Sequence, residues 1–567
     1  MQIYSFSPFG YEGALVAVEV DLRRGIPAVD IVGLADGTVK ESRERMQAAI
    51  RNSGFEFPGE RVLISLSPAD LKKEGAGFDL PIALSVLFSN AVLTCKGNFI
   101  EEPVLVMGEL ELSGKIRPVK GVHAAVATAY SFGVHHCIVP ALNADEAREV
   151  AGVLVYGADC LENAFCALKD LSFYKEGKSC GEAASLPDGA CEYNGVFFSK
   201  IDPGFEYGEL KGQGKLVRGL QIAAAGGHNF LAFGAPGCGK TMAIQKFAAI
   251  NPLLTVEEAQ SVTRIWSLAG LIKPDEPLVR VPPFRIPHQT SSVEGICGGG
   301  VSCRPGEISL AHNGVLFLDE AAEFRSSVLQ MLRVPLENNH ITLCRAGKST
   351  VYPAKFQLMM AVNPCPCGNY GSKTKVCLCS GKSVEQYWKK FSGPLLDRID
   401  LRVFVENEGE ENENVVKLES IAIGGGRISE RNEKNSGNGN NNLERGKIGT
   451  ESDRSYFRGE FSRTGIRTTH EIRLGVARAV RIQRERQGEK NARLTAEQVA
   501  KFCILDEETS QVLKKANERY GFSQRAIASC MKVARTIADL DGSKNIRKIH
   551  MEEAIQFRKD CNDIIPD

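Results

Sequence analysis

The sequence lacks the features that would indicate a membrane protein, an exported protein or a strongly basic nucleic-acid binder. Its 567 residues show neither a charged leader ahead of an apolar stretch nor an apolar run that we expect to span a bilayer. Lysine and arginine together number 69, and so do aspartate and glutamate, so the net charge of zero favours no polyanionic partner. We therefore expect a cytoplasmic protein that makes no contact with a membrane.

Aromatic residues are also few, at 7%, but 43% of the residues are hydrophobic, which is enough for several cores and two to four domains. Cysteine is not scarce, with 17 residues. A disulfide scaffold belongs to small secreted chains, so in this long chain we expect most thiols to be reduced and buried. The four cysteines between positions 365 and 379 are treated separately below.

A glycine-rich loop follows a short apolar strand at residues 228–233 and precedes a helical pattern. Its sequence GAPGCGKT places backbone N–H groups around a phosphate, with Lys240 as a charge for the outer phosphates and the Thr241 hydroxyl as a Mg²⁺ ligand. The sequence therefore predicts a site for ATP and Mg²⁺. The loop residues are Gly234, Ala235, Pro236, Gly237, Cys238, Gly239, Lys240 and Thr241.

Two further apolar strands end in polar residues that suit the same site. The first, within GVLFLDE, ends at Asp319, which we expect to hold Mg²⁺, and Glu320, which we expect to orient and deprotonate the attacking water. The second, FQLMMAV, ends at Asn363, which we interpret as a sensor that bonds the water between the two Walker strands. Because Asn363 precedes a proline, it is also a plausible start of a turn.

The segment SGPLLDRIDL places Arg398 at the end of a predicted helix. Arg398 is a candidate arginine finger, since a cation near the γ-phosphate of a neighbouring subunit stabilises the transition state. The alternative is an ion pair within the chain, with Asp397 or Asp400. A finger requires a dimer or a ring.

Together, the motifs PFRIPHQTSS, GGGVSCRPGEISLAHNGVLFLDE, NPCPCGNYG, SGPLLDRIDL and VARTIADLDG resemble the ComM/YifB family of magnesium-chelatase-like AAA+ ATPases. The resemblance covers nearly the whole chain outside residues 406–465. It implies an α/β P-loop AAA+ core, an α-helical lid, an α+β Lon-protease-like domain of the ribosomal-protein domain-2-like fold, and assembly into hexamers. For the ComM branch it implies DNA branch migration during natural transformation.

The resemblance also assigns residues in the lid and in the first domain. It places Arg525, in the motif FSQR, at the second sensor position, with Arg535 as a second candidate that is equally suited to pair with Asp539. In the Lon-like domain, Gly77 matches the position of the catalytic serine and His123 that of the catalytic lysine. Without a hydroxyl nucleophile and an amine base we expect no proteolysis.

Four cysteines form two C-x-C pairs, Cys365 with Cys367 and Cys377 with Cys379. Clustered thiolates suit a tetrahedral, structural Zn²⁺ site, although the spacing within each pair is tighter than the usual two residues, and free thiols are the alternative. A closed site would fix the loop after Asn363.

Composition divides the chain further. We expect a domain at residues 1–170, a linker at 171–195, the ATPase core at 196–405, a disordered low-complexity insertion at 406–465 and a helical domain at 466–567. The arginine-rich helix after the insertion has a predicted packing stripe at Ile472, Val476, Ala479, Val480 and Ile482. Its arginines either contact phosphates or form a solvated face.

Two insertions in the core are candidate working surfaces. Residues 283–307 are glycine-rich and suit a mobile loop, and residues 340–354 suit a β-hairpin with Lys348 near its tip. Lys348 is the candidate phosphate contact, and Arg345 is a candidate for the subunit interface.

Three functions fit these features. The first is a hexameric DNA motor, a helicase or branch-migration enzyme acting on branched, single-stranded or duplex DNA alongside recombination proteins. The second is a chelatase-type ATPase that drives metal insertion into a tetrapyrrole through a partner subunit, and the third is a protein-remodelling factor.

Overall fold

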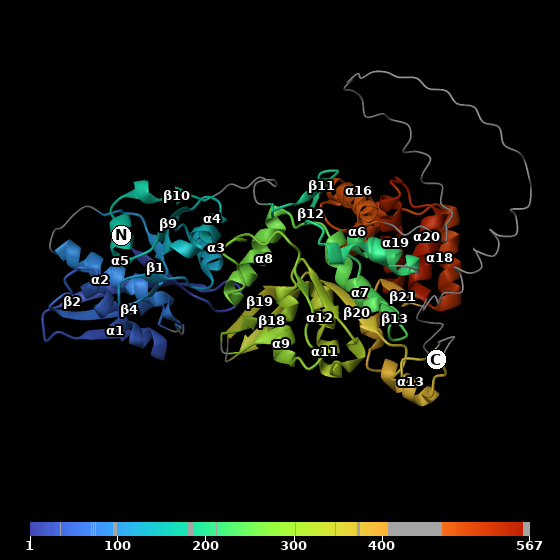
Figure 1. Ribbon diagram of the computed structural model, residues 1–567, viewed down its shortest axis with the longest axis horizontal. Helices are drawn as coiled ribbons and strands as arrows, with labels where there is room; N and C mark the ends of the chain where they lie inside the picture. Colours follow the sequence, from blue (N-terminus) through green and yellow to red (C-terminus); the bar gives the residue numbers. More distant parts are fainter. Residues whose placement is uncertain are drawn as a thin grey trace, which may run out of the picture.

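The computed structural model describes residues 1–34, 36–69, 71, 73, 75–93, 99–177, 186–210, 213–300, 302–345, 348–370, 375–405 and 468–559. The chain forms an N-terminal domain, a central domain and a group of C-terminal helices, which follow one another along the long axis of the molecule (Figure 1). The predicted insertion at residues 406–465 lies outside the described residues.

An eight-stranded mixed sheet organises the N-terminal domain, with the strand order β10-β9-β8-β5-β1-β2-β4-β3. Val62, Ile64 and Leu66 of β4 are buried and alternate with partly exposed residues, which explains why RVLISLS forms a strand with one face on the core. The predicted α+β domain is therefore present. Its strands are β1 (Ile3–Ser7), β2 (Ala14–Arg23), β3 (Val29–Val32), β4 (Arg61–Ser67), β5 (Val104–Val106), β8 (His136–Pro140), β9 (Leu154–Ala158) and β10 (Lys175–Glu176), with a small ladder of β6 (Glu109–Leu110) and β7 (Ile116–Arg117). Its helices are α1 (Gly37–Asn52), α2 (Asp79–Leu93), α3 (Val122–Ser131), α4 (Ala144–Arg148) and α5 (Leu161–Ala167).

One helical segment, Ala76–Leu93, is long and apolar enough to cross a membrane, with a mean hydropathy of 1.6. The expectation that the chain contains no apolar run of membrane-spanning length is therefore wrong. In the described structure the first half of α2, from Asp79 to Leu87, is buried within the N-terminal domain. Its apolar character is explained by its place in that core, where it packs on α1 and β2.

A five-stranded parallel sheet organises the central domain, with the order β14-β17-β20-β13-β21. Every residue of β13, β17 and β20 is buried, as expected for parallel strands covered on both faces. The predicted α/β core is therefore confirmed. The strands are β13 (Phe230–Gly234), β14 (Phe284–Arg285), β17 (Val315–Leu318), β20 (Gln357–Val362) and β21 (Leu401–Val405). The helices are α6 (Gly214–Gly226), α7 (Lys240–Gln245), α8 (Val256–Ala269), α9 (Val293–Cys297), α10 (Glu307–Leu310), α11 (Ser326–Met331), α12 (Arg333–Asn338), α13 (Gly381–Trp388) and α14 (Gly393–Leu396).

Two short antiparallel ladders accompany this sheet in the described part of the chain. The predicted hairpin is present as β18 (His340–Arg345) and β19 (Lys348–Pro353), in the register Arg345↔Lys348. The glycine-rich segment contains the ladder of β15 (Gly298–Gly299) and β16 (Arg304–Pro305).

Parts of the predicted linker form short strands that lie against the neighbouring domains. β10 pairs with β9 at the edge of the N-terminal sheet, and β11 (Cys191–Tyr193) pairs with β12 (Val196–Phe198) beside the C-terminal helices. Residues 178–185 lie outside the described part.

The C-terminal helices pack on the central domain through one shared hydrophobic cluster. This cluster includes Phe230 of β13 and Val403 of β21 together with Val476 and Ile537 from the helices. Of the predicted stripe on α16, four residues are buried and Ile482 is only partly so. The helices are α16 (Thr469–Gln487), α17 (Ala496–Phe502), α18 (Glu507–Tyr520), α19 (Gln524–Leu540) and α20 (Lys548–Lys559).

The N-terminal domain docks on α8 of the central domain, where α3 and α8 lie side by side (Figure 1). Arg264 of α8 donates to the Tyr11 carbonyl at 3.1 Å and to the Thr128 hydroxyl at 2.8 Å, and its guanidinium stacks over the Tyr11 ring. The Ser267 hydroxyl donates to the buried Glu146 carboxylate at 2.5 Å. This polar interface fixes the first turn of the N-terminal domain against the centre of the molecule.

Replacing Arg264 with alanine should weaken this interface by about 2 kcal/mol, because the side chain is mostly buried and several acceptors lose their donor. Hydrogen exchange should then accelerate in the turn between β1 and β2, while β13 and β20 stay protected. Arg23→Ala is the matched control, since its ion pair with Asp21 is more than half exposed and is worth at most about 1 kcal/mol. Unchanged exchange in the Arg264 variant would contradict the assigned role.

Candidate active site

The carboxyl ends of three adjacent strands bring the predicted nucleotide-binding residues together. β20 lies between β13 and β17 in the sheet, so Asn363 ends its strand between the glycine loop and the Asp319–Glu320 pair. This placement matches the role predicted for a residue between the two Walker strands, and open parallel sheets bind ligands at this edge.

The glycine loop joins β13 to α7. Gly237 and Gly239 have φ values of +81° and +82°, a region that L-residues rarely adopt, while a Cβ atom at either position would meet no atom within 4 Å. The loop therefore requires glycine for its backbone conformation and not for space. Open space beside the loop leaves room for a ligand.

Lys240 is buried and its ammonium lies inside the loop. Its Nζ donates to the carbonyls of Gly234 at 2.7 Å and Ala235 at 2.9 Å, and lies 3.4 Å from Oδ1 of Asn363. Burial lowers the pKa of Lys240, while the nearby Asp319 and Glu320 carboxylates act in the opposite direction. The ammonium is thus held by neutral acceptors that phosphate oxygens can replace.

The two predicted magnesium ligands are in contact. The Thr241 hydroxyl donates to Oδ1 of Asp319 at 3.0 Å, so both oxygens face the same point. A hydroxyl and a carboxylate are hard oxygen ligands of the kind that Mg²⁺ binds together with phosphate. These residues fit the cation that the glycine loop implies.

Glu320 has a backbone conformation that is unusual for its type, with φ of +47°. This left-handed geometry turns the chain sharply after β17, directly before the short 3₁₀ turn Ala321–Glu323. Oε2 of Glu320 accepts a hydrogen bond of 2.5 Å from the Gln289 side-chain amide. Sequence reasoning missed Gln289, which it placed in a mobile glycine-rich loop.

The position of Gln289 explains this contact. It follows β14, which pairs with β17, so its chain leaves the sheet at the edge where Glu320 lies. The sequence could have indicated Gln289 only as a polar residue that follows a strand next to β17. That strand, β14, is only two residues long and therefore shows no periodicity in the sequence.

Two arginines share one carboxylate within the chain. Arg398 pairs with Glu337 of α12 and also donates to the Pro394 carbonyl, and Arg525 contacts the other oxygen of Glu337 at 3.4 Å. The alternative of an intrachain ion pair is therefore present, with Glu337 as the partner. Hydrogen bonding to Arg398 lowers the pKa of Glu337.

The partners proposed for Arg398 from its sequence neighbours are engaged elsewhere. Asp400 lies 3.4 Å from Nδ1 of the buried His228 and accepts from the Ser529 hydroxyl, and Asp397 lies 3.5 Å from Arg558. The two aspartates thus join the central domain to the C-terminal helices.

Arg535 does not face the glycine loop. It is buried, pairs with Asp539 at 3.0 Å and donates to the carbonyls of Ser543 and Lys544. The pairing with Asp539 that the helical spacing indicated is confirmed. Arg525 and Arg535 are the two candidates for the second sensor. Of these, Arg525 on the first turn of α19 is the exposed one, with 42% of its side chain accessible.

The four cysteines of the C-x-C pairs come together beside Asn363. Their sulfur atoms all lie within 4.8 Å of one another, and Cys365 is fully buried. A group of four thiols at this separation fits a tetrahedral soft metal ion. The prediction of a cysteine cluster is therefore confirmed.

The hairpin of β18 and β19 carries the predicted DNA contact. The backbone of Lys348 begins β19, but its side chain and that of Arg345 lie outside the described part of the structure, as do residues 346 and 347. The role of Lys348 therefore stays a prediction.

The positions that match the protease residues hold no catalytic pair. Gly77 lies in the 3₁₀ turn Ala76–Phe78. His123 is buried in α3, where its Nε2 lies 2.7 Å from the side-chain oxygen Oε1 of Gln260 in α8, and burial lowers its pKa to about 4. A neutral imidazole that faces the central domain offers neither an amine base nor access to a peptide.

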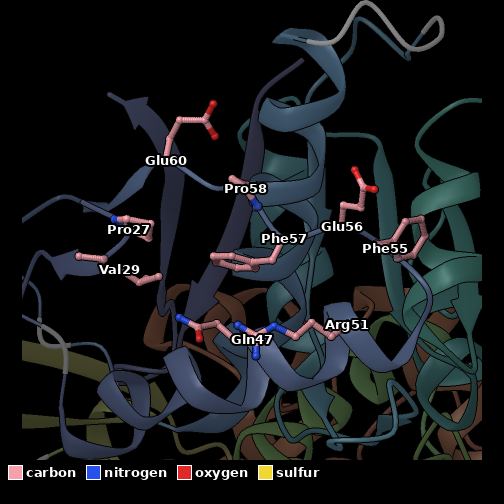
Figure 2. A pocket seen from close by; sticks show the side chains of 10 residues that line it. Pro27, Val29, Gln47, Arg51, Phe55, Glu56, Phe57, Pro58 and Glu60 are labelled. Atoms are coloured by element: carbon pink, nitrogen blue, oxygen red, sulfur yellow. The ribbon is translucent and has the colours of Figure 1, made fainter. Parts of the chain in front are cut away.

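A hollow of about 560 Å³ lies far from these strand ends, on the N-terminal domain between α1 and the segment that leads into β4 (Figure 2). Phe57, Pro58 and Gln47 line it together with Arg51. It contains none of the predicted site residues.

Replacing Gln289 with alanine should raise basal ATP hydrolysis by up to about tenfold, because the bond to the charged carboxylate is worth about 1.5 kcal/mol or more and restrains the oxygen that must approach water. Steady-state phosphate release without a macromolecular partner measures this. A loss of activity as deep as that of Glu320→Gln would show instead that Gln289 assists the reaction.

Arg398→Ala should lower the rate of hydrolysis by about 10³-fold and leave nucleotide binding intact, as expected for a finger that acts on a neighbouring subunit. Mixing this variant with Lys240→Ala subunits should restore hydrolysis, because each supplies the group that the other lacks. Glu337→Gln is the control, since it removes the intrachain partner but keeps the finger. Failure of the mixed subunits to recover activity would assign Arg398 to the intrachain pair alone.

Comparison with known families matches three parts of the chain. Residues 206–413 match the family described as "Magnesium chelatase, subunit ChlI", residues 18–143 match "Subunit ChlI of Mg-chelatase", and residues 467–558 match "Magnesium chelatase, subunit ChlI C-terminal". The glycine loop, Asp319, Glu320, Asn363 and Arg398 fall within the first match, and Arg525 falls within the third.

Two of the relatives match nearly the whole chain. It is 35% identical over 559 residues to an uncharacterized protein, YifB, of Escherichia coli, which covers 98% of this chain and 96% of the relative. It is 34% identical over 557 residues to the competence protein ComM of Haemophilus influenzae, covering 98% and 97%. A magnesium-chelatase 38 kDa subunit of Cereibacter sphaeroides is 24% identical over 176 residues, covering 28% of this chain and 53% of that subunit.

Proposed function

This chain belongs to the YifB/ComM family of magnesium-chelatase-like AAA+ ATPases, and we propose that it is a ring-forming, ATP-driven motor that moves branched DNA. The observation that carries the proposal is that one domain contains both the residues of a nucleotide-binding site and a β-hairpin. Lys240 lies 3.4 Å from Asn363, Thr241 donates to Asp319, and β18 pairs with β19 in the same domain.

Hydrolysis in this proposal takes place at the boundary between subunits. Lys240 and the glycine loop bind the phosphates, Thr241 and Asp319 hold Mg²⁺, Asn363 orients the water and Glu320 accepts its proton. Arg398 of the neighbouring subunit exchanges its bond with Glu337 for the γ-phosphate, and Arg525 acts as the second sensor. A hexamer is the assembly that the family resemblance implies.

DNA is the proposed substrate because the full-length similarity includes a protein named for competence. A hairpin with a basic residue near its tip suits a phosphate backbone, which is bound with strong salt dependence and little sequence preference. ATP binding orders each subunit boundary, hydrolysis loosens it, and the hairpins shift along the strand.

A second candidate is a chelatase-type ATPase that drives metal insertion through a partner subunit. It is favoured by the match of residues 206–413 to the ChlI description. The similarity to the chelatase subunit spans only 28% of this chain, whereas the similarity to the competence protein spans 98%. The longer similarity favours the DNA motor.

Purified wild-type protein should migrate a four-way DNA junction when ATP and Mg²⁺ are present, and branched DNA should stimulate its ATP hydrolysis. Lys240→Ala should abolish nucleotide binding, and Glu320→Gln should bind nucleotide but leave the junction unmoved. Lys348→Ala should reduce the stimulation by DNA and preserve basal hydrolysis, whereas Lys273→Ala, an exposed lysine paired with Glu276, should match the wild type. ATP hydrolysis that is unaffected by any DNA would reject the motor and leave the chelatase-type or protein-remodelling function.

A further inference from the structure

The cysteine cluster lies against the nucleotide-binding loop as well as beside the sensor strand. Sγ of Cys365 lies 3.3 Å from Sγ of Cys367 and 3.6 Å from Sγ of Cys377, and the sulfurs of Cys367 and Cys377 are 3.5 Å apart. With Zn–S bonds of about 2.3 Å, the sulfurs of a tetrahedral site lie about 3.8 Å apart. The observed separations are close to this value, so the site is built for a small ion with four sulfur ligands.

The segment between Asn363 and Gly368 connects this cluster to the loop. Gly368 directly follows Cys367, and its amide donates to the Cys365 carbonyl at 2.9 Å, which closes a turn around the first ligand pair. The turn approaches the nucleotide loop so closely that a Cβ atom on Gly368 would lie 2.6 Å from Cδ and Cγ of Pro236. The φ of Gly368 is +77°, so glycine is required here both for conformation and for space.

The same segment contacts the glycine loop at a second point and is also hydrogen-bonded to residues outside the loop. At its start, Asn363 lies 3.4 Å from the Lys240 ammonium. On the opposite side, the Trp388 indole donates to the Pro364 carbonyl at 3.0 Å, and the Tyr370 amide donates to Sγ of Cys365 at 3.3 Å. The segment is therefore held between the nucleotide loop and the cysteine cluster.

Pro236 occupies a sensitive position in the loop. It lies between Ala235, whose carbonyl accepts from Lys240, and Gly237, which has the left-handed conformation. A shift of Pro236 displaces the two backbone groups on either side of it, and these groups shape the phosphate site. The Cys365–Gly368 turn therefore lies against the residue that connects these two groups.

We propose that the four thiolates bind one zinc ion per subunit and that this ion sets nucleotide affinity by holding the Cys365–Gly368 turn against Pro236. The inference rests on the proposed function only in that the glycine loop binds ATP. Four-sulfur zinc sites are structural, and removal of the ion frees Cys365 and Cys367 from the second ligand pair. The turn then relaxes away from Pro236, and the loop loses the wall that fixes it.

The test measures zinc content and nucleotide affinity on the same full-length samples, without DNA. Zinc is determined by elemental mass spectrometry, and affinity by titration with a fluorescent ATP analogue in Mg²⁺. The wild type should contain one zinc per chain. Cys377→Ser, which removes a ligand that does not adjoin the turn, should lose zinc and bind nucleotide about tenfold more weakly, equivalent to about 1.4 kcal/mol.

Two further variants separate the metal from the turn. Gly368→Ala should keep its zinc and still weaken nucleotide binding, because the added methyl group displaces Pro236. Cys166→Ser, at an exposed cysteine in α5 of the N-terminal domain, should match the wild type in both measurements. If Cys377→Ser does not fold, as judged by its melting curve, the same two measurements on wild-type protein stripped of zinc by a chelator, before and after zinc is added back, replace it.

Each contrary result has a distinct meaning. A wild-type protein that contains no zinc and takes up none from added zinc chloride overturns the metal site. Wild-type nucleotide affinity in zinc-free Cys377→Ser, or in Gly368→Ala, overturns the coupling and leaves the proposed function intact. Failure of the wild type itself to bind the ATP analogue overturns the proposed function and this inference together.

Discussion

The buried ammonium of Lys240 is the interaction on which the rest of the active site depends. It lies where three parallel strands end, and its contacts with Gly234, Ala235 and Asn363 join the glycine loop to the sensor strand. A buried cation is costly unless acceptors surround it, so this part of the fold is stable only if the strands keep their register. The same register brings Thr241 to Asp319. The strand register that surrounds the Lys240 ammonium with acceptors is therefore the same register that brings the residues of the candidate active site together.

The two arginines predicted to act on the nucleotide meet at one carboxylate within the chain. Arg398 and Arg525 are attracted to a single carboxylate, Glu337, whose negative charge they neutralise. A nucleotide carries more negative charge than one carboxylate, so in the proposed ring it competes for these cations when a neighbouring site approaches. The single chain holds the proposed finger in an ion pair with Glu337, and the proposed assembly exchanges that pair for the nucleotide.

Sequence reasoning predicted the site best where a motif has a fixed backbone shape. The glycine loop, Asp319 and Asn363 follow strands whose apolar runs were visible, and parallel strands bring their ends together. Gln289 and Glu337 were missed because each contacts its partner through the fold, across 31 residues for Glu320 and 61 for Arg398. The contact of His123 with Gln260 likewise joins two domains, and neither residue carries a pattern that indicates it. Sequence reasoning also overlooked the segment Ala76–Leu93, which is apolar and long enough to span a membrane but forms a largely buried helix in the N-terminal domain.

The first turn of the N-terminal domain has a mechanical consequence for the hairpin. The Tyr11 amide donates to the Thr350 hydroxyl at 3.1 Å, and the Tyr11 ring packs edge-on against Tyr352. β19 is therefore in contact with the turn between β1 and β2. Arg264 of α8 bonds to the same turn through the Tyr11 carbonyl. Thr350 also fills the space next to Gly10. In the proposed motor, a movement of the hairpin therefore carries the N-terminal domain with it, because the contacts of Tyr11 join the two.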